Sequence, residues 1–327
     1  MMSNRIPVIL CLICLFIFFT EVLDTDKKPM IKPASSFDRR TEEWTPLNMD
    51  ELPFNDSGNQ IRYGSDLITN TSFYLGPKGR VTQISNGMNC QNCHLSGGTR
   101  LSGYNFAAVS STYPRFRERS GITESIAFRI NACLQRSLNG KKLDSSNYEM
   151  QSMVSYLKWL GTGVPKGARP RSAGARTLPF MERAADSARG RIIFLNKCQR
   201  CHLENGQGLM SQDSTSYIYP PLWGPASYNT ASGMYRIGLL AGFIKNYMPY
   251  DFSAPDQLTD EAAWDVAAFI SSQPRPEKYF EQDWPDPSIK PVDHPFGPYA
   301  DGFNESQHKY GPFKPIMEAR RKQKEKK

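Results

Sequence analysis

The pattern of apolar and polar positions predicts a chain built mainly from amphipathic helices. The clearest stretch begins at Thr123, which is expected to cap a helix, with Glu124 in its first turn. The Asn-Gly pair at 139–140 is expected to end it. The apolar stripe of this helix recurs at three- and four-residue spacings and comprises Ile126, Ile130, Cys133 and Leu134. Cys133 is therefore expected to face inward.

Four further helices follow from the same periodicity. The first covers residues 146–160, ends at Gly161, and has an apolar face of Met150, Met153, Val154, Leu157 and Leu160. Helices are also predicted over residues 185–196, 231–247 and 259–272, the last beginning at Thr259. The 185–196 helix is expected to bury Ile192, Ile193 and Leu195, and the 259–272 helix Trp264, Val266, Ala267 and Ile270.

Segments rich in Pro and Gly separate these helices. Residues 24–54 are polar and contain Pro, which predicts a linker with little structure of its own. Residues 162–179, rich in Gly, Pro, Ala and Arg, are predicted to connect two halves of the chain. After residue 275 the chain is dense in Pro, Gly and aromatic residues, so an ordered but irregular extension over the surface is expected.

An apolar run near the N-terminus predicts export. Residues 6–19 carry no polar side chain and follow Arg5. This pattern is typical of a secretory signal or an uncleaved anchor, although 14 residues are short for a spanning helix of about 20. Cys11 follows Val8, Ile9 and Leu10 in a lipobox-like order but lies early in the run. Cleavage and anchoring both remain open.

Charge gives only a modest basic excess, with 40 Lys and Arg against 32 Asp and Glu. Its last part is a run expected to be a solvated, disordered tail rather than an anion-binding or partner-docking element, formed by Arg320, Arg321, Lys322, Lys324, Lys326 and Lys327. No basic motif is interleaved with aromatic residues as in nucleic-acid-binding segments, so no nucleic-acid partner is expected.

Two copies of a pentapeptide carry the chemistry. They are Cys90-Gln91-Asn92-Cys93-His94 and Cys198-Gln199-Arg200-Cys201-His202. A C-x-x-C-H sequence is the attachment signature of c-type haem, in which two thiols form thioethers and the histidine binds the iron. A redox dithiol or half of a zinc site is the alternative for one copy, but two copies in a chain with four histidines make it improbable. Two covalently bound haem c groups are predicted.

The motifs and the helices together predict a mainly α fold with two cytochrome c-like domains and a Pro-rich irregular C-terminal extension. The order of helix, haem motif, loop, Met-Pro and helix in the second half is that of a small cytochrome c. The predicted boundaries are an export segment or anchor at 1–23, a linker at 24–54, the first domain at 55–165, a linker at 166–184, the second domain at 185–275 and the extension at 276–327.

The ligand opposite each histidine decides what each haem does. Met248-Pro249 stands 46 residues after His202, where the proline stops the preceding helix. A thioether opposite histidine raises the reduction potential and suits electron transfer, so Met248 is the expected sixth ligand of the second haem. Met210 and Met234 compete with it, and each could equally fill the core.

In the first domain the candidate sixth ligands are Cys133, Met150 and Met153, and both methionines fit a core role. Cys133 is the one cysteine left after the export segment and the two motifs. Buried cysteines are commonly inert, but this one has a dense group of arginines near it in sequence: Arg115, Arg117, Arg119, Arg129 and Arg136. Such fixed cations lower a thiol pKa and attract oxyanions, unless they form a solvated helix face.

Residues 129–140, read Arg-Ile-Asn-Ala-Cys-Leu-Gln-Arg-Ser-Leu-Asn-Gly, together with both haem motifs strongly resemble the dihaem thiosulfate dehydrogenases. The likeness extends over residues 156–165, 243–249 and 264–276. It implies a periplasmic enzyme that couples two thiosulfates into tetrathionate or catalyses the reverse, exchanging electrons with a small c-type cytochrome or another redox partner.

Carried over by position, the resemblance implies that Cys133 is both the sixth ligand of the first haem and the catalytic residue, forming a covalent S-thiosulfonate. Arg119, Arg129 and Ser137 match the residues that hold the sulfonate oxygens, and Met248 matches the ligand of the second haem. Some members have a ligating lysine close before this methionine. Here Tyr247 precedes it and Lys245 is three residues away, so plain His/Met ligation is preferred.

Two readings from other classes remain. A dihaem electron carrier without a substrate site would have His/Met ligation at both haems. A sulfur-oxidation cytochrome subunit would share Cys/His ligation but transfer sulfur to a carrier protein. A dihaem peroxidase is disfavoured because nothing marks a haem left open for peroxide. The physiological direction, the electron acceptor and attachment of the N-terminus to a membrane stay open.

Overall fold

The computed structural model describes residues 37–38, 42–250 and 257–325. Three predicted segments lie wholly or partly outside these residues. They are the export segment with Cys11, residues 24–36 and 39–41 of the 24–54 linker, and Lys326 and Lys327 of the basic tail. The chain divides into two units, 1–34 and 35–327, and the described residues all belong to the second. Within the described residues, no helix is both long enough and apolar enough to span a bilayer.

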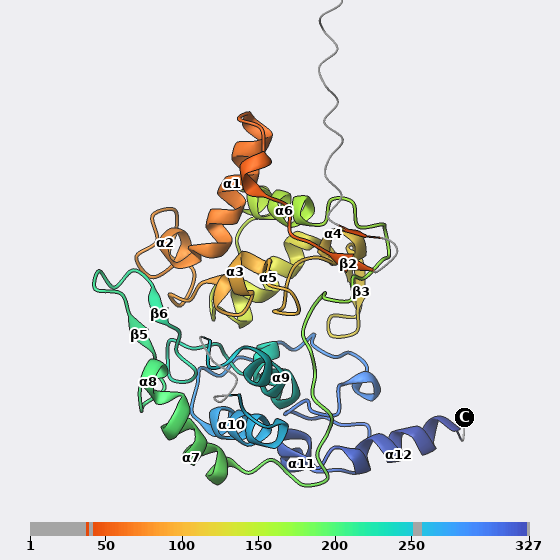
Figure 1. The fold of residues 1–327 in the computed structure, drawn as a ribbon. Coiled ribbons are helices and arrows are strands. Elements are labelled where there is room, and N and C mark those ends of the chain that lie inside the picture. Colours follow the sequence, from red (N-terminus) through yellow and green to blue (C-terminus); the bar gives the residue numbers. More distant parts are fainter. Residues whose placement is uncertain (1–36, 39–41, 251–256, 326–327) are drawn as a thin grey trace, which may run out of the picture. The chain divides into compact units, whose positions relative to one another are not determined.

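The first haem motif lies among the helices of residues 56–160, grouped together in Figure 1. Two long helices, α1 (Asp56–Thr69) and α6 (Tyr148–Leu160), pack against each other. Between them the chain forms α2 (Thr71–Leu75), the 3-10 turn η3 (Cys90–Asn92), α3 (Leu95–Gly98), α4 (Val109–Thr112), a hairpin of β3 (Arg115–Arg117) and β4 (Ile122–Glu124), and α5 (Ile126–Arg136). Ahead of α1 stand β1 (Phe37–Asp38), β2 (Glu43–Trp44) and η2 (Met49–Glu51).

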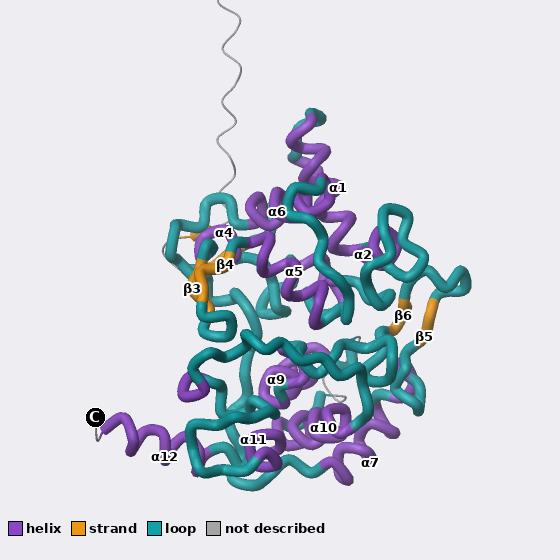
Figure 2. Tube along the Cα trace, turned by 180° about the vertical axis from the view of Figure 1, so that it is seen from behind, coloured by secondary structure: helices purple, strands orange, loops and turns teal. Residues whose placement is uncertain are grey.

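The second half repeats this plan. Helix α7 (Ser187–Lys197) leads into α8 (Gln199–His202), a hairpin of β5 (Leu209–Met210) and β6 (Tyr217–Tyr219), η4 (Gly233–Tyr235), α9 (Ile237–Tyr247) and α10 (Asp260–Ser272). The extension then forms η6 (Pro287–Ile289), α11 (Glu305–Tyr310) and α12 (Lys314–Glu325), which Figure 2 shows beside the second set of helices. The predicted mainly helical fold is confirmed, and the few strands are two or three residues long.

Each half has its own apolar core. The first is centred on α1, α5 and α6, and the faces predicted for the 146–160 helix are buried there, with Met150 and Met153 fully inaccessible. The second is centred on α7, α9 and α10, and buries Trp264, Val266, Ala267 and Ile270 as predicted. Phe313 and Ile316 of the extension are part of the second core, so the extension is packed rather than loosely laid on the surface.

A glycine sits at the crossing of the first and last helix in each half. A Cβ on Gly64 of α1 would lie 2.0 Å from the carbonyl oxygen of Ser152 in α6. A Cβ on Gly190 of α7 would lie 1.9 Å from the carbonyl oxygen of Asp265 in α10. The backbones of the crossing helices therefore approach equally closely in both halves, and only glycine permits this approach.

We expect Gly190→Ala to lower the free energy of unfolding by about 3 kcal/mol, the upper part of the usual range for overpacked cores, because a backbone carbonyl cannot rotate aside. Chemical denaturation of the holoprotein measures this. Gly302→Ala is the matched control, because a Cβ there meets nothing within 4 Å. Equal stability of the two variants would contradict the account of the crossing.

Three predicted helix details were wrong. Helix α5 begins at Ile126 with Ser125 as its cap, because Thr123 and Glu124 are taken up by the β3–β4 hairpin. In α7 the fully buried residue is Phe194, whereas Ile192 is 61% exposed. The 231–247 stretch is divided at Arg236 into η4 and α9. Residues one or two positions apart can serve equally well as a helix cap or as the buried residue of a turn. Tertiary packing decides which of them takes that role.

Two segments predicted to lack structure have it. In the 24–54 linker, Trp44 of β2 is 2% exposed and donates its indole N–H to the Leu160 carbonyl at 2.9 Å. In the basic tail, residues to Glu325 form α12, where the Arg320 guanidinium pairs with the buried Asp301 carboxylate at 2.8 Å. The extension is likewise less irregular than predicted, since it contains η6 and α11.

Candidate active site and haem pockets

The first motif is placed so that its histidine is oriented for metal binding. Cys90 lies in η3, and His94 follows directly after Cys93. The His94 Nδ1 lies 2.6 Å from the Tyr104 carbonyl oxygen, and its ring is tilted against the Phe106 ring with 4.4 Å between the centroids. An Nδ1–H donated to a carbonyl fixes the tautomer and leaves Nε2 free to bind a metal. These residues therefore fit a c-type haem.

The second motif has the same arrangement. Helix α7 delivers the chain to Cys198, and the His202 Nδ1 lies 2.9 Å from the Pro220 carbonyl oxygen. A cavity of about 620 Å³ opens beside it, lined by both motif cysteines, His202 and Met248. Cys93 of the first motif lines the same cavity, so the two motifs adjoin. A predominantly apolar cavity with one oriented histidine fits the second haem.

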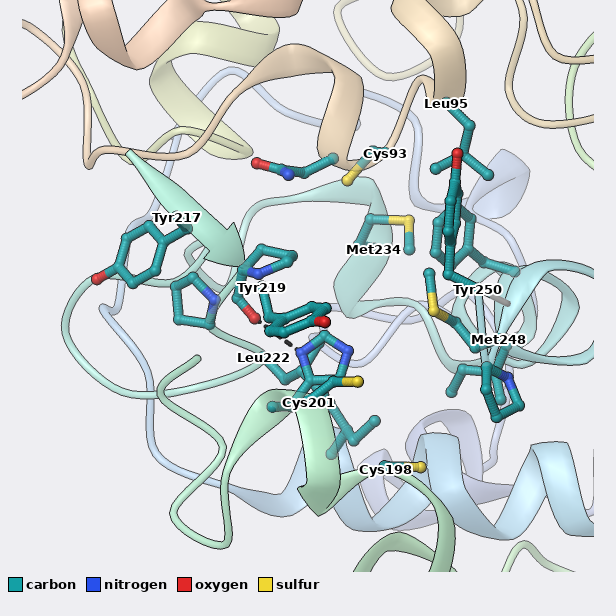
Figure 3. Close-up of a pocket in the computed structure, with 18 of the residues that line it drawn as sticks. Cys93, Leu95, Cys198, Cys201, Tyr217, Tyr219, Leu222, Met234, Met248 and Tyr250 are labelled. Atoms are coloured by element: carbon teal, nitrogen blue, oxygen red, sulfur yellow. Dashed lines mark hydrogen bonds between the residues drawn. The ribbon is translucent and has the colours of Figure 1, made fainter. Parts of the chain in front are cut away.

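Both Met234 and Met248 line this cavity, and in Figure 3 they point into the space between Cys93 and Cys198. Met210, the third candidate, lies in β5, is 37% exposed and does not line the cavity. Met248 directly follows α9, at the place where the chain turns away, whereas Met234 lies within the 3-10 turn η4. Two of the three methionines that the sequence offered as ligands of the second haem therefore line the cavity, Met234 and Met248.

Lys245 is engaged elsewhere. Its ammonium group donates to the Leu258 carbonyl at 2.5 Å and lies 3.6 Å from the Asp260 carboxylate. A lysine whose ammonium group is engaged by a carbonyl and a carboxylate is not positioned to bind a metal. This geometry favours methionine over lysine opposite His202.

Cys133 lies on α5, close enough to the first histidine for His94 to act on the pKa of its thiol. Burial raises the pKa of the thiol, but the charge of Arg129 and the contact with His94 outweigh it and lower the pKa to about 7. A cysteine with such a pKa has a substantial thiolate fraction near neutral pH, and the thiolate is the form that binds metals and attacks sulfur. The structure thus brings Cys133 close to His94, and ligation of the first haem by Cys133 stays a prediction.

The arginines near Cys133 are not a solvated face. Arg129 stands one helical turn before Cys133, and the thiolate charge raises the pKa of its guanidinium. Arg119 follows strand β3 and is largely buried. Its pKa is lowered to about 10, first by burial and then by the like charge of Arg136. Arg115 and Arg117 belong to β3 and are half-buried.

Ser137 caps the end of α5 and meets the second half of the chain. Its hydroxyl lies 3.2 Å from the hydroxyl of Ser232. The neighbouring Asn229 donates to the Gln135 carbonyl at 2.8 Å, and Arg119 donates to the Ala231 carbonyl at 3.2 Å. A loop of the second half, residues 229–232, therefore borders the proposed substrate site, which sequence reasoning missed.

A second group of residues that sequence reasoning missed comes from the extension. The Asp283 carboxylate accepts a hydrogen bond from Arg136 Nη2 at 2.8 Å, and the Arg136 guanidinium lies 3.7 Å from the centre of the Phe280 ring. The Trp284 amide donates to the Arg119 carbonyl at 2.6 Å. These residues lie about 150 positions from Cys133 in sequence, and no local motif marks them.

Known families match both halves of the chain. Residues 81–165 match the family described as SoxA/TsdA, cytochrome c domain, and residues 187–274 match the family described as cytochrome c. Each match includes one of the two pentapeptides. The chain thus has two cytochrome c domains, and these account for two covalently bound haem c groups.

Two relatives named thiosulfate dehydrogenase illustrate the similarity. One, from Allochromatium vinosum, is 39% identical over 59% of this chain and 72% of its own length. Another, from Psychrobacter arcticus, is 35% identical over 72% of this chain and 69% of its own length.

A solved structure titled thiosulfate dehydrogenase (TsdBA) from Marichromatium purpuratum is 30% identical and superposes with a TM-score of 0.67 over 74% of this chain. This chain spans about half, 52%, of that protein. The two matched cytochrome c domains, the fold and the extent of identity together show that the chain belongs to the thiosulfate dehydrogenase family of dihaem c-type cytochromes.

Proposed function

We propose that this protein interconverts thiosulfate and tetrathionate at the haem of the first domain and exchanges the electrons through the haem of the second. The observation that carries the proposal is Cys133, which adjoins the oriented His94 and lies among buried arginines. A protein that only carries electrons needs neither a thiolate beside the haem-binding histidine nor buried arginines around that thiolate. An electron carrier without a substrate site is therefore disfavoured.

Cys90, Cys93, Cys198 and Cys201 would hold the two haem groups through thioethers, and His94 and His202 would each bind one iron. Cys133 and Met248 are the proposed sixth ligands. When bound, the two haems accept or supply one electron each, which matches the two-electron chemistry. The adjoining motifs, with Cys93 lining the second cavity, support direct transfer between them.

The protein's own residues supply the rest of the chemistry. Thiosulfate and tetrathionate are dianions, so Arg119 and Arg129 lower the repulsion between two of them, and the Ser137 hydroxyl donates to a sulfonate oxygen. The Cys133 thiolate attacks the central S–S bond of tetrathionate. One sulfur forms an S-thiosulfonate with Cys133 and the other leaves as thiosulfate, with no net electron transfer. Two electrons then release the second thiosulfate, and oxidation follows the same steps in reverse.

Met248 sets the potential of the electron-transfer haem in this proposal. We expect Met248→Leu to lower the potential of that haem by roughly 0.1 V or more, a fraction of the approximately 0.8 V that axial ligands span. Potentiometric titration of the holoprotein measures this. Met234→Leu is the matched control, because Met234 lines the same cavity. A fall in Met234→Leu and none in Met248→Leu would assign the ligand to Met234.

The cellular compartment and the redox partner are proposed from membership of the family. Covalent haem c and an apolar N-terminal run support a periplasmic location in this proposal, with residues 6–19 as a signal or a membrane anchor. A small c-type cytochrome or another redox partner takes or supplies the electrons.

The test is turnover by the purified holoprotein. With thiosulfate and a one-electron acceptor, the proposal expects two thiosulfates consumed per tetrathionate formed, and tetrathionate reduction with a donor. Absence of both reactions would favour the electron carrier. Thiosulfate consumption that requires a carrier protein and yields no tetrathionate would favour the sulfur-oxidation subunit.

A further inference from the structure

The C-terminal extension is anchored over the arginines of the first domain by a loop, residues 278–284. At one end of this loop, the Lys278 ammonium donates to the Gly140 carbonyl at 3.1 Å and its amide to the Thr230 hydroxyl at 3.0 Å. At the other end, the Trp284 amide donates to the Arg119 carbonyl at 2.6 Å. The loop therefore has a fixed position relative to the first domain and the 229–232 loop.

Asp283 lies between two guanidinium groups. Its carboxylate is 2.8 Å from Arg136 Nη2 and 3.9 Å from Arg119 Nε. The side chains of Asp283, Arg136 and Arg119 are 19%, 11% and 17% exposed. Two guanidiniums that share one carboxylate in such a shielded place attract it strongly, and without it they would repel each other.

Arg136 is held so that part of its hydrogen-bonding capacity stays free. Nη2 is used by Asp283 and the flat face by Phe280, whereas Nε and Nη1 are buried and have no hydrogen-bond partner within the described part of the chain. The Trp284 indole N–H is also buried and unpartnered there. Buried donors are normally satisfied, so these are suited to the oxygens of a bound oxyanion. The charge of Arg136 also acts on Cys133.

We propose that Asp283 is a positioning residue for the reaction at Cys133: together with Phe280 it holds Arg136 and Arg119 in place, so that the free donors of Arg136 and Trp284 receive the sulfonate of a thiosulfate. The inference rests on the proposed function and deepens it, because it makes the extension part of the substrate site. Asp283 itself touches neither the substrate nor the haem.

The sign of the kinetic effect follows from the charge. Asp283→Asn removes a negative charge from a site for dianions, so ground-state binding is not weakened by electrostatics. The arginines lose the group that orients them, and misplaced groups slow the chemical step. We expect kcat for thiosulfate oxidation to fall about 10- to 100-fold while KM changes less than about threefold. Asp283→Glu is expected to recover part of the rate.

Glu281→Gln is the matched control. It removes the same charge from an exposed position two residues away in the same loop and should keep the wild-type kcat and KM. Phe280→Ala is the second test, because it removes the surface under Arg136 without changing charge, and it should also lower kcat. The crystal structure of the Asp283→Asn holoprotein should show the Arg136 guanidinium displaced from its present position.

The outcomes separate this inference from the function on which it rests. Wild-type kcat in Asp283→Asn would overturn the positioning role and leave the proposed function intact. A large rise in KM with unchanged kcat would also overturn it, because that is the mark of a lost binding contact. If the wild type turned over neither oxyanion, the proposed function would fail. The positioning would then be judged on the crystal structure, where unmoved arginines overturn it.

Discussion

Cys133→Ser is expected to lower the rates of thiosulfate oxidation and tetrathionate reduction by at least about a thousandfold, the scale of loss when a nucleophile is removed. A hydroxyl stays protonated near neutral pH and is a weak nucleophile towards sulfur. The thiol is different, because the charge of Arg129 and the contact with His94 lower its pKa to about 7 despite burial. Steady-state assays in both directions measure the loss.

The serine variant must keep its haems for this comparison to be valid. Cys133 is not part of either C-x-x-C-H motif, so the haem content per chain should equal that of the wild type. The absorption spectrum of the oxidised first haem should change, since serine does not replace a thiolate ligand. A variant with both haems, an altered spectrum and undiminished turnover would show that Cys133 ligates without being catalytic.

Arg129→Leu carries the second largest expected effect. Arg129 is one helical turn from Cys133, and its charge is the main influence that lowers the thiol pKa. Its removal takes away both a cation that a dianion needs and the charge that favours the thiolate. We expect kcat/KM to fall by about 10²- to 10³-fold, as when one donor to a developing charge is lost.

Two comparisons sharpen the Arg129 result. Arg129→Lys keeps a charge without the planar fork and should lie between the wild type and the leucine variant. Arg321→Leu removes an arginine whose side chain is 67% exposed in α12, and should leave kcat/KM unchanged. If Arg129→Leu and Arg321→Leu behaved alike, the arginine would have no role at the site.

The parts of the fold that could be predicted are those that local sequence specifies. The two pentapeptides, the 148–160 helix and the 260–272 helix each carry their signal within a few turns, and the structure has them where they were expected. Helix α1 has little such signal: it contains two glycines and several polar residues, and buries only Gly58, Gly64, Leu67 and Ile68. Its formation depends on packing against α6, which no local pattern reveals.

The candidate site likewise contains residues that a local motif indicates and residues that only tertiary packing brings there. Cys133, Arg129 and Ser137 lie on one short helix and its end, so a motif could indicate all three. Asn229, Ser232 and Asp283 reach the same place from the second domain and the extension. A single sequence does not reveal which distant carboxylate will meet which arginine, because that is fixed by how the two domains and the extension pack.

Peptide mass spectrometry of Cys133 would detect the proposed covalent intermediate itself. The as-purified oxidised protein would be incubated with tetrathionate without an electron donor, then quenched and digested. We expect a thiosulfonate adduct on Cys133, with one thiosulfate released per adduct and the modification reversed by a reductant. Protein that reduces tetrathionate when a donor is supplied, but leaves Cys133 unmodified under these conditions, would contradict it.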